Sequence, residues 1–282
     1  MQTTPRCALI HDLSGFGRCS LTIIIPVLSA MGVQCCPLPT AYLSTHTAFP
    51  GNSFLDMTES MAAAADHWAT LNIDFRAIYS GFMSSLRQID LTADFVRTFR
   101  RENTQVIVDP VMGDHGRPYR TYTPELCTAM GKLADLADMI TPNLTEASIL
   151  LDEPYDESLT TNEAACCRLV ERLSREGSRS VVLTGVSIEP GQTGSACFDK
   201  MSGNISIVQV PLVDRAFHGT GDLFAAVLTG SLLRNCSLTD AAQRAADFAR
   251  TCVAHTLEQD LPPREGVDFE PLLWQLGRSV LN

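Results

Sequence analysis

Short apolar runs alternate along the chain with longer stretches in which apolar residues recur every three or four positions. The short runs are bounded by turn residues and predict buried strands, while the longer stretches have the period of amphipathic helices. The predicted strands cover residues 7–10, 35–43, 78–81, 106–109, 139–141 and 180–184. The predicted helices cover residues 20–31, 54–71, 91–101, 124–134, 145–151, 161–176, 220–233, 239–258 and 269–281. This alternation is typical of an α/β fold with a mainly parallel sheet.

Two further β-rich runs lie between residues 195 and 210 and are joined by Met201-Ser202-Gly203-Asn204, which predicts a hairpin. No long linker rich in Pro, Gly or Ser, no block of charge and no solenoid repeat divides the chain. We therefore expect one doubly wound domain over residues 1–282. In such sheets ligands bind at the carboxyl ends of the strands, so the residues that follow each predicted strand are the candidates for function.

Composition and charge argue against several kinds of partner. The chain is 45% hydrophobic and 19% charged, which is ordinary for a globular protein. Its net charge of -11 and the absence of a basic run argue against nucleic acid or an anionic membrane surface. Residues 1–10 lack the apolar stretch of a signal peptide, and no segment has the length of an apolar membrane span, so we expect a cytoplasmic protein. The ten cysteines include no C-x-x-C pair, which predicts reduced thiols rather than a zinc site or a disulfide framework.

The strongest chemical signal is the segment Phe217-His218-Gly219-Thr220-Gly221-Asp222, where a Gly-rich turn runs directly into an apolar helix. Gly219 and Gly221 let a ligand approach the backbone closely, and the free N–H groups at the start of the helix favour an anion. Asp222 falls in the first helical turn, where a carboxylate is stabilised by the helix dipole and can act as a base. Taken alone, the segment is equally compatible with a plain turn and a capped helix.

Two other strand ends carry oxygen ligands. Asp109 and Asp114 follow one predicted strand, where carboxylates can hold Mg²⁺ directly or through water. Thr141, Asn143 and Glu146 follow the next strand, and Asn143 is also a good helix cap. A solvated loop and a cap would explain each segment separately. They do not explain why neighbouring strands end in the same polar fashion.

After the next strand, Thr184 and Gly185 form a small polar pair that can lie against a nucleotide without filling its space. Taken together, these strand ends offer a helix N-terminus and carboxylates but no basic cluster. This combination fits phosphoryl transfer, because that reaction needs positioning and charge stabilisation far more than covalent chemistry.

Near the amino end, Gly15-Phe16-Gly17-Arg18-Cys19-Ser20 follows a strand and invites comparison with a dinucleotide-binding turn. The third glycine of that motif is missing, and about 20 residues further on, where the motif needs an acid, the chain has Cys35-Cys36-Pro37. The dinucleotide interpretation is therefore disfavoured. Asp12 and the run Ser44-Thr45-His46-Thr47 follow two predicted strands and can line a small-molecule pocket.

The run Gly219-Thr220-Gly221-Asp222-Leu223-Phe224-Ala225-Ala226 resembles the anion-hole and catalytic-base motif of pyridoxal kinases. Asp109-Pro110-Val111-Met112-Gly113-Asp114, Thr141-Pro142-Asn143-Leu144-Thr145-Glu146 and Ser44-Thr45-His46-Thr47 resemble further motifs of that family, in the same order. The resemblance implies a ribokinase-like three-layer αβα sandwich, usually a homodimer. It also implies transfer of the γ-phosphate of ATP to the 5′-hydroxymethyl group of pyridoxal, pyridoxamine or pyridoxine, with Mg²⁺ and optionally a monovalent cation such as K⁺.

Carried over position by position, the resemblance also implies roles for single residues. The base that takes the hydroxyl proton corresponds to Asp222, and the anion hole corresponds to Gly219, Thr220 and Gly221. The cation site corresponds to Asp109, Thr141 and Glu146, and the ATP contacts correspond to Asp114, Asn143, Thr184 and Gly185. The substrate contacts correspond to Asp12, Thr47 and Tyr122.

The first loop departs from the pyridoxal kinase pattern. Those enzymes usually begin with Ser-His-Val, whereas His11-Asp12-Leu13-Ser14-Gly15 resembles the Asp-x-Ser-Gly run of hydroxymethylpyrimidine kinases. The pyrimidine kinases, in turn, typically have Cys where this chain has Asp222. A kinase of hydroxymethylpyrimidine or of another small alcohol is therefore an alternative of the same fold. A vitamin B6-binding sensor is a non-enzyme alternative, although a sensor should lose the base or the cation ligands, and this chain keeps both.

Overall fold

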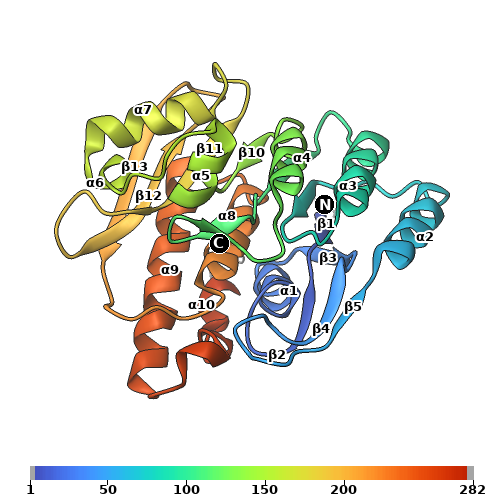
Figure 1. Ribbon diagram of the computed structural model, residues 1–282, viewed down its shortest axis with the longest axis horizontal. Coiled ribbons are helices and arrows are strands. Elements are labelled where there is room, and N and C mark those ends of the chain that lie inside the picture. Colours follow the sequence, from blue (N-terminus) through green and yellow to red (C-terminus); the bar gives the residue numbers. More distant parts are fainter. Residues whose placement is uncertain (1–3, 278–282) are drawn as a thin grey trace.

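An eight-stranded sheet crosses the molecule in the strand order β13-β12-β11-β10-β7-β6-β1-β3 (Figure 1). The structure is a computed structural model that describes residues 4–277. The strands from β3 to β11 pair in parallel, and β12 and β13 complete the sheet as an antiparallel hairpin, as predicted. The bounds are β3 Gln34–Pro37, β1 Arg6–Ile10, β6 Ala77–Ser80, β7 Gln105–Val108, β10 Met139–Ile140, β11 Ser180–Val186, β12 Gln192–Phe198 and β13 Ile205–Pro211.

Helices cover both faces of this sheet, which explains why its central strands are almost continuously apolar. On one face, Leu9 and Tyr79 belong to an apolar core with α1 (Leu21–Ala30), α8 (Thr220–Leu232) and α9 (Leu238–Glu258). On the other face, Ile78 and Val106 belong to a second apolar core. The helices of that face are α2 (Thr58–Ala69), α3 (Leu86–Phe99), α4 (Pro124–Ala134), α5 (Leu144–Leu151) and α7 (Glu163–Leu173). Two cores separated by one sheet make a three-layer αβα sandwich, so the predicted fold class is confirmed.

A second, three-stranded sheet lies beside the amino-terminal part of the main sheet and consists of β2 (Leu13–Phe16), β4 (Ala41–Thr45) and β5 (Phe54–Asp56) (Figure 1). The sequence prediction was wrong here in two places. The single predicted strand 35–43 is two strands, β3 and β4, in different sheets, because the chain leaves the main sheet after Pro37. The predicted helix 54–71 begins only at Thr58, because residues 54–56 pair with β4.

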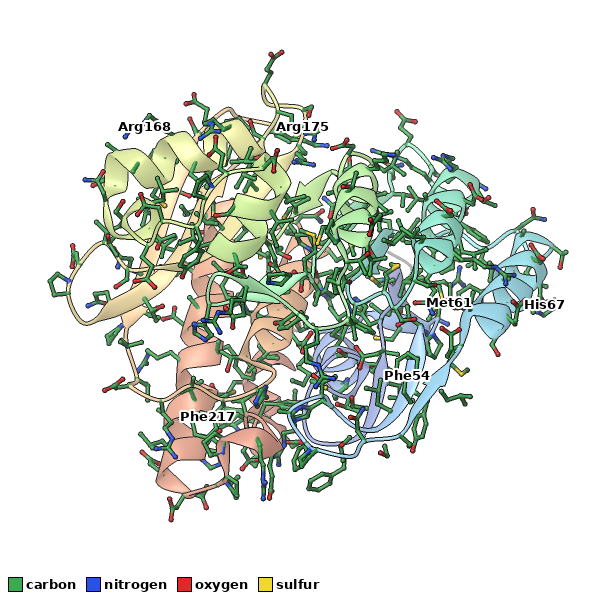
Figure 2. All side chains as sticks on the ribbon, viewed as in Figure 1. Phe54, Met61, His67, Arg168, Arg175 and Phe217 are labelled. Carbon is green, nitrogen blue, oxygen red and sulfur yellow. The ribbon has the colours of Figure 1, made fainter. Side chains whose placement is uncertain are left out.

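Local sequence signals set several helix boundaries. The hydroxyl of Thr123 accepts a hydrogen bond from the backbone N–H of Leu126, and Pro124 occupies the first helical position, so α4 begins where the sequence predicts. In Figure 2 the side chain of Met61 lies where α2 meets the rest of the molecule, and His67 lies nearer the outer end of the helix. The helix thus buries one face only, as its amphipathic pattern requires.

Several short elements were not predicted. They are the hairpin of β8 (Gly113–Asp114) and β9 (Arg117–Pro118), α6 (Ser158–Thr161) and the 3-10 turn Pro263–Glu265. The predicted helix 269–281 is a 3-10 turn, Glu270–Leu272, followed by α10 (Trp274–Gly277), and its last four positions lie outside the described residues. Among the helices of residues 4–277, none is long and apolar enough to cross a lipid bilayer.

Candidate active site

The register of the main sheet brings several candidate residues to one edge. Strands β6 and β10 both pair with Val108, the last residue of β7. The residues that follow, Gly81, Asp109 and Thr141, therefore leave the sheet side by side at its carboxyl edge. Asp12 follows β1, which is the next strand along. The strand-end motifs that were separate in the sequence thus converge in space.

A Gly-rich turn brings the start of α8 to this edge. Gly219 is the N-cap of α8 and has a φ of 80°, which favours glycine, and a Cβ atom there would come within 2.3 Å of the carbonyl oxygen of Arg18. Gly221 differs, because a Cβ atom there would meet no atom within 4 Å. Packing therefore does not require glycine at position 221, and the space beside the free N–H groups of the helix is open to an anion.

Asp222 lies in the first turn of α8 and is partly buried. Its Oδ2 atom accepts a hydrogen bond of 2.8 Å from the backbone N–H of Ser20. Burial raises the pKa of the Asp222 carboxyl to about 7; the bond from Ser20 opposes this rise and the negative charge of Asp12 adds to it. A carboxyl with a pKa near neutrality is well matched to accept a proton from a hydroxyl group at physiological pH.

Asp109 is the second carboxyl of the cluster. Burial, assisted by the charge of Asp222, raises the pKa of Asp109 to about 7, while the nearby hydroxyl of Thr141 lowers it. The Oγ1 atom of Thr141 is itself buried and has no hydrogen-bond partner within bonding distance among residues 4–277. A buried hydroxyl without a partner is uncommon in folded proteins and suits a site that receives a ligand or an ion.

Glu146 has a structural role that the sequence prediction did not include. Its Oε2 atom accepts a hydrogen bond from the backbone N–H of Asn143 (2.8 Å), and its Oε1 atom accepts one from Met112 (3.2 Å). With the reciprocal bond from the Glu146 N–H to Asn143 Oδ1, this is a capping box at the start of α5. Burial and the charge of Asp109 raise the pKa of Glu146 well above its usual range. The amide of Asn143 also donates to the carbonyl of Gly113, which ties α5 to the β8–β9 hairpin.

The predicted cation residues do not form a closed metal site. Within the described chain, no three His, Cys, Asp or Glu side chains are grouped closely enough to hold a metal ion by themselves. Asp114 is exposed, and its Oδ1 atom accepts a hydrogen bond from the N–H of His115. This open arrangement still fits Mg²⁺, because that ion usually keeps several waters and binds one or two carboxylates together with substrate phosphates. The unpartnered hydroxyl of Thr141 beside Asp109 agrees with such a fit.

Asp12, a predicted substrate contact, is buried at the carboxyl end of β1. Its two oxygens accept hydrogen bonds from the hydroxyls of Ser20 (2.5 Å) and Ser14 (3.3 Å), and burial raises the pKa of its carboxyl. Ser20 therefore connects the carboxylates of Asp12 and Asp222, through its side chain and its backbone N–H respectively. No functional role was predicted for Ser20. Its place just before an apolar helix indicates a cap, but its hydroxyl turns to Asp12 instead.

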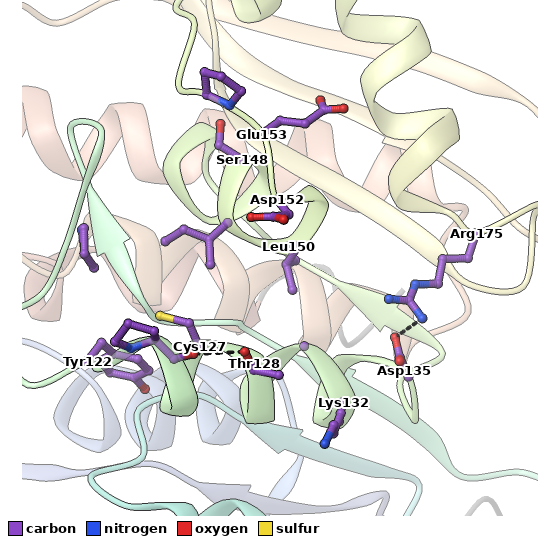
Figure 3. A pocket seen from close by; sticks show the side chains of 15 residues that line it. Tyr122, Cys127, Thr128, Lys132, Asp135, Ser148, Leu150, Asp152, Glu153 and Arg175 are labelled. Atoms are coloured by element: carbon purple, nitrogen blue, oxygen red, sulfur yellow. Dashed lines mark hydrogen bonds and ion pairs between the residues drawn. The ribbon is translucent and has the colours of Figure 1, made fainter.

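The other two predicted substrate contacts lie in different environments. Thr47 is exposed in the loop after β4, whereas Tyr122 is buried and its hydroxyl accepts a hydrogen bond from the N–H of Met83 (3.4 Å). Tyr122 also lines a cavity of about 910 Å³ between α4 and α5 (Figure 3). The edge of its ring faces Phe82, with ring centroids 6.3 Å apart. Phe82 was missed in the sequence, although it comes directly after a predicted strand.

The predicted nucleotide contacts lie at the far end of the same edge. Gly185 has a φ of 76° and sits where the β11–β12 register shifts, and a Cβ atom there would meet nothing within 4 Å. Thr184 is partly buried, and its N–H donates to the carbonyl of Pro142 (2.9 Å). The space beside Gly185 is therefore open.

Comparison with known proteins finds similarity to kinases named for phosphomethylpyrimidine or for pyridoxal. A family model described as phosphomethylpyrimidine kinase matches residues 25–262. A provisionally named phosphomethylpyrimidine kinase of Bacteroides thetaiotaomicron VPI-5482, crystallised in an orthorhombic form with pyridoxal, is 40% identical, with a TM-score of 0.92. That alignment covers 97% of this chain and 96% of the other. Pyridoxal kinase from Lactobacillus plantarum is 29% identical, with a TM-score of 0.89 and 97% of both chains covered.

A curated pyridoxine/pyridoxal/pyridoxamine kinase of Bordetella avium (strain 197N) is 28% identical over 277 residues. That match covers 92% of this chain and 90% of the relative. Other matches cover less of the relative. The chain spans only 58% of the length of a curated relative from Caenorhabditis elegans. The residues matched by the family model include the ends of β6, β7, β10 and β11 and the start of α8, whereas Asp12 lies before the first matched residue.

Proposed function

Because this chain belongs to the phosphomethylpyrimidine kinase family, we propose that it phosphorylates the 5′-hydroxymethyl group of a vitamin B6 compound with ATP, in pyridoxal 5′-phosphate salvage. The acceptor is pyridoxal, pyridoxamine or pyridoxine. The names of the Lactobacillus and Bordetella relatives support this substrate class. So does the pyridoxal in the crystals of the Bacteroides protein.

The observation that carries the proposal is the position of Asp222. It combines a pKa of about 7 with a place in the first turn of α8, directly after Gly221, where the space beside the helix is open. In the proposed reaction, the hydroxyl group of the vitamer lies next to Asp222, which takes its proton as the oxygen attacks the γ-phosphorus of ATP. The N–H groups of residues 219–221 face the transferred phosphoryl group and stabilise its charge.

The remaining strand ends hold the nucleotide. Mg²⁺, when bound with ATP, neutralises charge on the phosphates, and Asp109, Thr141 and Glu146 are the residues that would hold it or its waters. We assign Asp114, Asn143, Thr184 and Gly185 to contacts with ATP. We assign the binding of a monovalent cation such as K⁺ to the same carboxylates. The protein provides no basic cluster here, so backbone N–H groups and the cation must balance the phosphate charge.

Asp12→Ala tests the substrate side of the site, to which we assign Asp12, Thr47 and Tyr122. The carboxylate of Asp12 is buried, and we place the ring nitrogen or 3-hydroxyl of the vitamer against it. The substitution is therefore expected to raise KM for the vitamer several-fold more than KM for ATP. Steady-state kinetics with each substrate varied in turn measures both constants. Equal changes in the two constants would place Asp12 outside the vitamer site.

The pH dependence follows from the raised pKa of Asp222. A base must be ionised to act, so kcat/KM for the vitamer is expected to fall about tenfold for each pH unit below about 7 and to level off above it. Asp109 has a pKa of about 7 and lies in the field of Asp222, so the profile reports both groups together. Rates measured across this range with pyridoxal test the prediction. A flat profile down to about pH 5 would contradict a base of this pKa.

Hydroxymethylpyrimidine is the second candidate substrate, because the family model is described as a kinase of a related pyrimidine, phosphomethylpyrimidine, and the first loop contains an Asp-x-Ser-Gly run. ADP release measured with pyridoxal, pyridoxamine, pyridoxine, hydroxymethylpyrimidine and ribose separates the candidates in one experiment. The B6 proposal requires the highest kcat/KM with one of the three vitamers, and preference for the pyrimidine would replace it. We also propose a homodimer from the family resemblance, which light scattering of the purified protein tests.

A further inference from the structure

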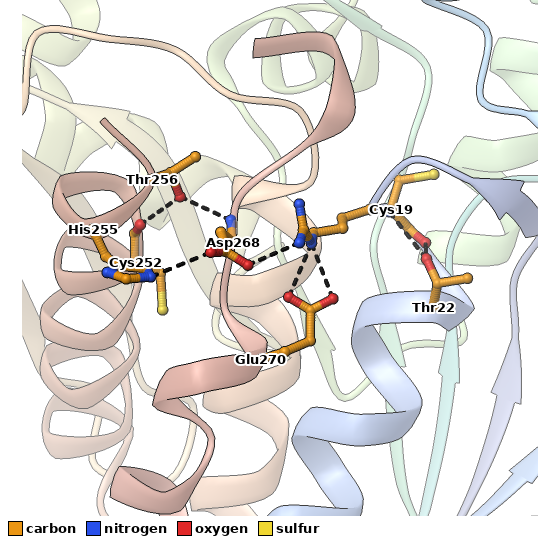
Figure 4. Close-up of polar contacts among 8 residues, drawn as sticks. Cys19, Thr22, Cys252, His255, Thr256, Asp268 and Glu270 are labelled. Atoms are coloured by element: carbon orange, nitrogen blue, oxygen red, sulfur yellow. Dashed lines mark hydrogen bonds and ion pairs between the residues drawn. The ribbon is translucent and has the colours of Figure 1, made fainter. Parts of the chain in front are cut away.

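The side chain of Arg18 joins the loop before α1 to the carboxyl-terminal part of the chain. Its Nη2 atom donates to Asp268 Oδ1 (2.8 Å), and its Nε atom donates to both carboxylate oxygens of Glu270 (2.9 and 3.0 Å). Figure 4 shows Asp268 and Glu270 beside the start of α1, in contact with this guanidinium group. Arg18, Asp268 and Glu270 are together called the Arg18 clamp.

The clamp is anchored on the carboxyl-terminal side. The second oxygen of Asp268 contacts His255 Nε2 (3.2 Å), and the backbone N–H of Asp268 donates to the hydroxyl of Thr256 (2.8 Å) (Figure 4). Both contacts come from α9, a helix of 21 residues. Asp268 is therefore fixed to a long element of the fold before it meets Arg18.

The backbone of Arg18 is fixed as well. Its N–H donates to the carbonyl of Glu265 (3.0 Å), and it lies between two glycines with positive φ, Gly219 and Gly266. A Cβ atom on Gly266 would come within 2.7 Å of the Arg18 backbone, and one on Gly219 within 2.3 Å. The turn that begins α8 thus packs directly against Arg18, with no room for even a methyl group between them.

Two residues further along, Ser20 contacts both carboxylates of the site. Its N–H donates to Asp222 and its hydroxyl donates to Asp12. Ser20 has a φ of 47°, which is uncommon for a residue other than glycine and persists only where its surroundings hold it. On one side Ser20 is held by the start of α1. On the other side it is held by the segment that Arg18 fixes.

We propose that the Arg18 clamp positions Asp222 for catalysis, by fixing the segment whose Ser20 N–H orients the Asp222 carboxylate. This inference rests on the proposed role of Asp222 as the base. In this proposal Arg18 acts on Asp222 through the segment that carries Ser20, so it is a positioning residue. The clamp is well suited to this, because the side chains of Arg18 and Asp268 are only 26% and 14% exposed and the guanidinium group contacts two carboxylates at once, which fixes its geometry as well as its charge.

The test compares Arg18→Gln in two backgrounds. In the wild-type protein, the substitution is expected to lower kcat with pyridoxal by about 10- to 100-fold, the cost of a misplaced reacting group, with both KM values nearly unchanged. In the Asp222→Asn protein, assayed at high enzyme concentration, the same substitution is expected to change kcat by less than about threefold, because a positioning residue has no effect once the group it positions is gone. Arg18→Lys keeps one charged contact and should recover part of the rate.

Arg100→Gln is the matched control. Arg100 forms a similar tertiary ion pair with Asp138 (2.7 Å), but Asp138 precedes β10 and so lies at the opposite edge of the sheet. Loss of the Arg100–Asp138 ion pair should leave kcat unchanged. If Arg18→Gln does not fold, Asp268→Asn, which keeps the shape of the side chain, is measured in the same two backgrounds.

Two results would overturn the clamp. One is an equal loss of kcat from Arg18→Gln in both backgrounds. The other is a rise in both KM values with kcat unchanged, which indicates general loosening of the site. Failure of the proposed function looks different, since the wild-type protein would then prefer none of the three vitamers. Failure of Asp222 as the base would show as an Asp222→Asn protein that keeps its activity.

Discussion

Asp222→Asn is expected to lower kcat for the B6 vitamer by about 10²- to 10⁴-fold, the usual contribution of a positioned base. The amide keeps the shape of the carboxylate and can still accept the hydrogen bond from Ser20. It cannot accept the hydroxyl proton. ATP affinity should stay the same or improve, because the change removes a negative charge beside the γ-phosphate. Steady-state kinetics with pyridoxal and ATP measures both effects.

The stability of the Asn variant provides its control. Because the pKa of Asp222 is raised in the folded protein, its ionisation disfavours folding, and this cost appears as the pH rises from the ordinary pKa of a carboxyl towards about 7. The variant should therefore melt at a temperature no lower than wild type at pH 8, and the difference should shrink in acid, where Asp222 is protonated. A folded variant with kcat within about threefold of wild type would remove Asp222 from the mechanism.

Asp109→Asn is expected to have the second-largest effect, on the response to Mg²⁺. The concentration of free Mg²⁺ that gives half-maximal rate should rise at least about tenfold, because even groups that only orient metal ligands commonly contribute that much. The substitution also removes a charge that raises the pKa of Glu146. The variant should therefore fold at least as well as wild type above neutral pH. Initial rates at fixed ATP and increasing Mg²⁺ measure the effect.

Asp109 is the better choice for this test than Glu146. Both carboxylate oxygens of Glu146 accept backbone N–H bonds, one from Asn143 at the start of α5 and one from Met112. Replacing Glu146 therefore also weakens a helix cap, at a cost of about 1 kcal/mol. Asp94→Asn serves as a control, because Asp94 is an exposed carboxylate on α3 that forms a surface ion pair with the side chain of Arg97. An Asp109 variant with the Mg²⁺ response of this control would exclude Asp109 from the cation site.

Most of the main sheet could be predicted from the sequence, because its strands are short apolar runs with turn residues on both sides. The small sheet could not. Its strand β2 contains Leu-Ser-Gly-Phe, which has neither a β-branched residue nor a clear alternation. Residues 54–56 adjoin a helical pattern and become a strand only because β4 lies beside them. Pairing between distant segments decided both cases.

The sequence by itself determined the layers of the fold and the four polar strand ends, because hydrophobic period and turn chemistry are local properties. It also located Gly219 and Asp222, since a Gly-rich turn before an apolar helix is visible in the residues themselves. Only the tertiary structure decided how the carboxyl groups act on each other. The raised pKa values of Asp109 and Asp222 come from burial and from the charges of Asp222 and Asp12 respectively, which lie far away in the chain, and no local pattern encodes that proximity.

The tertiary structure also decided which hydrogen bonds hold the site together. Ser20 and Asp222 form a hydrogen bond although they are 202 positions apart in the sequence, and Arg18 and Asp268 do so although they are 250 positions apart. Glu146 is read as a metal ligand from its place after a strand, yet folding gives both its oxygens to backbone N–H groups first. A residue's type shows which bonds it can form. Its partners are fixed only when the chain packs, because burial removes the water that would otherwise satisfy each polar group.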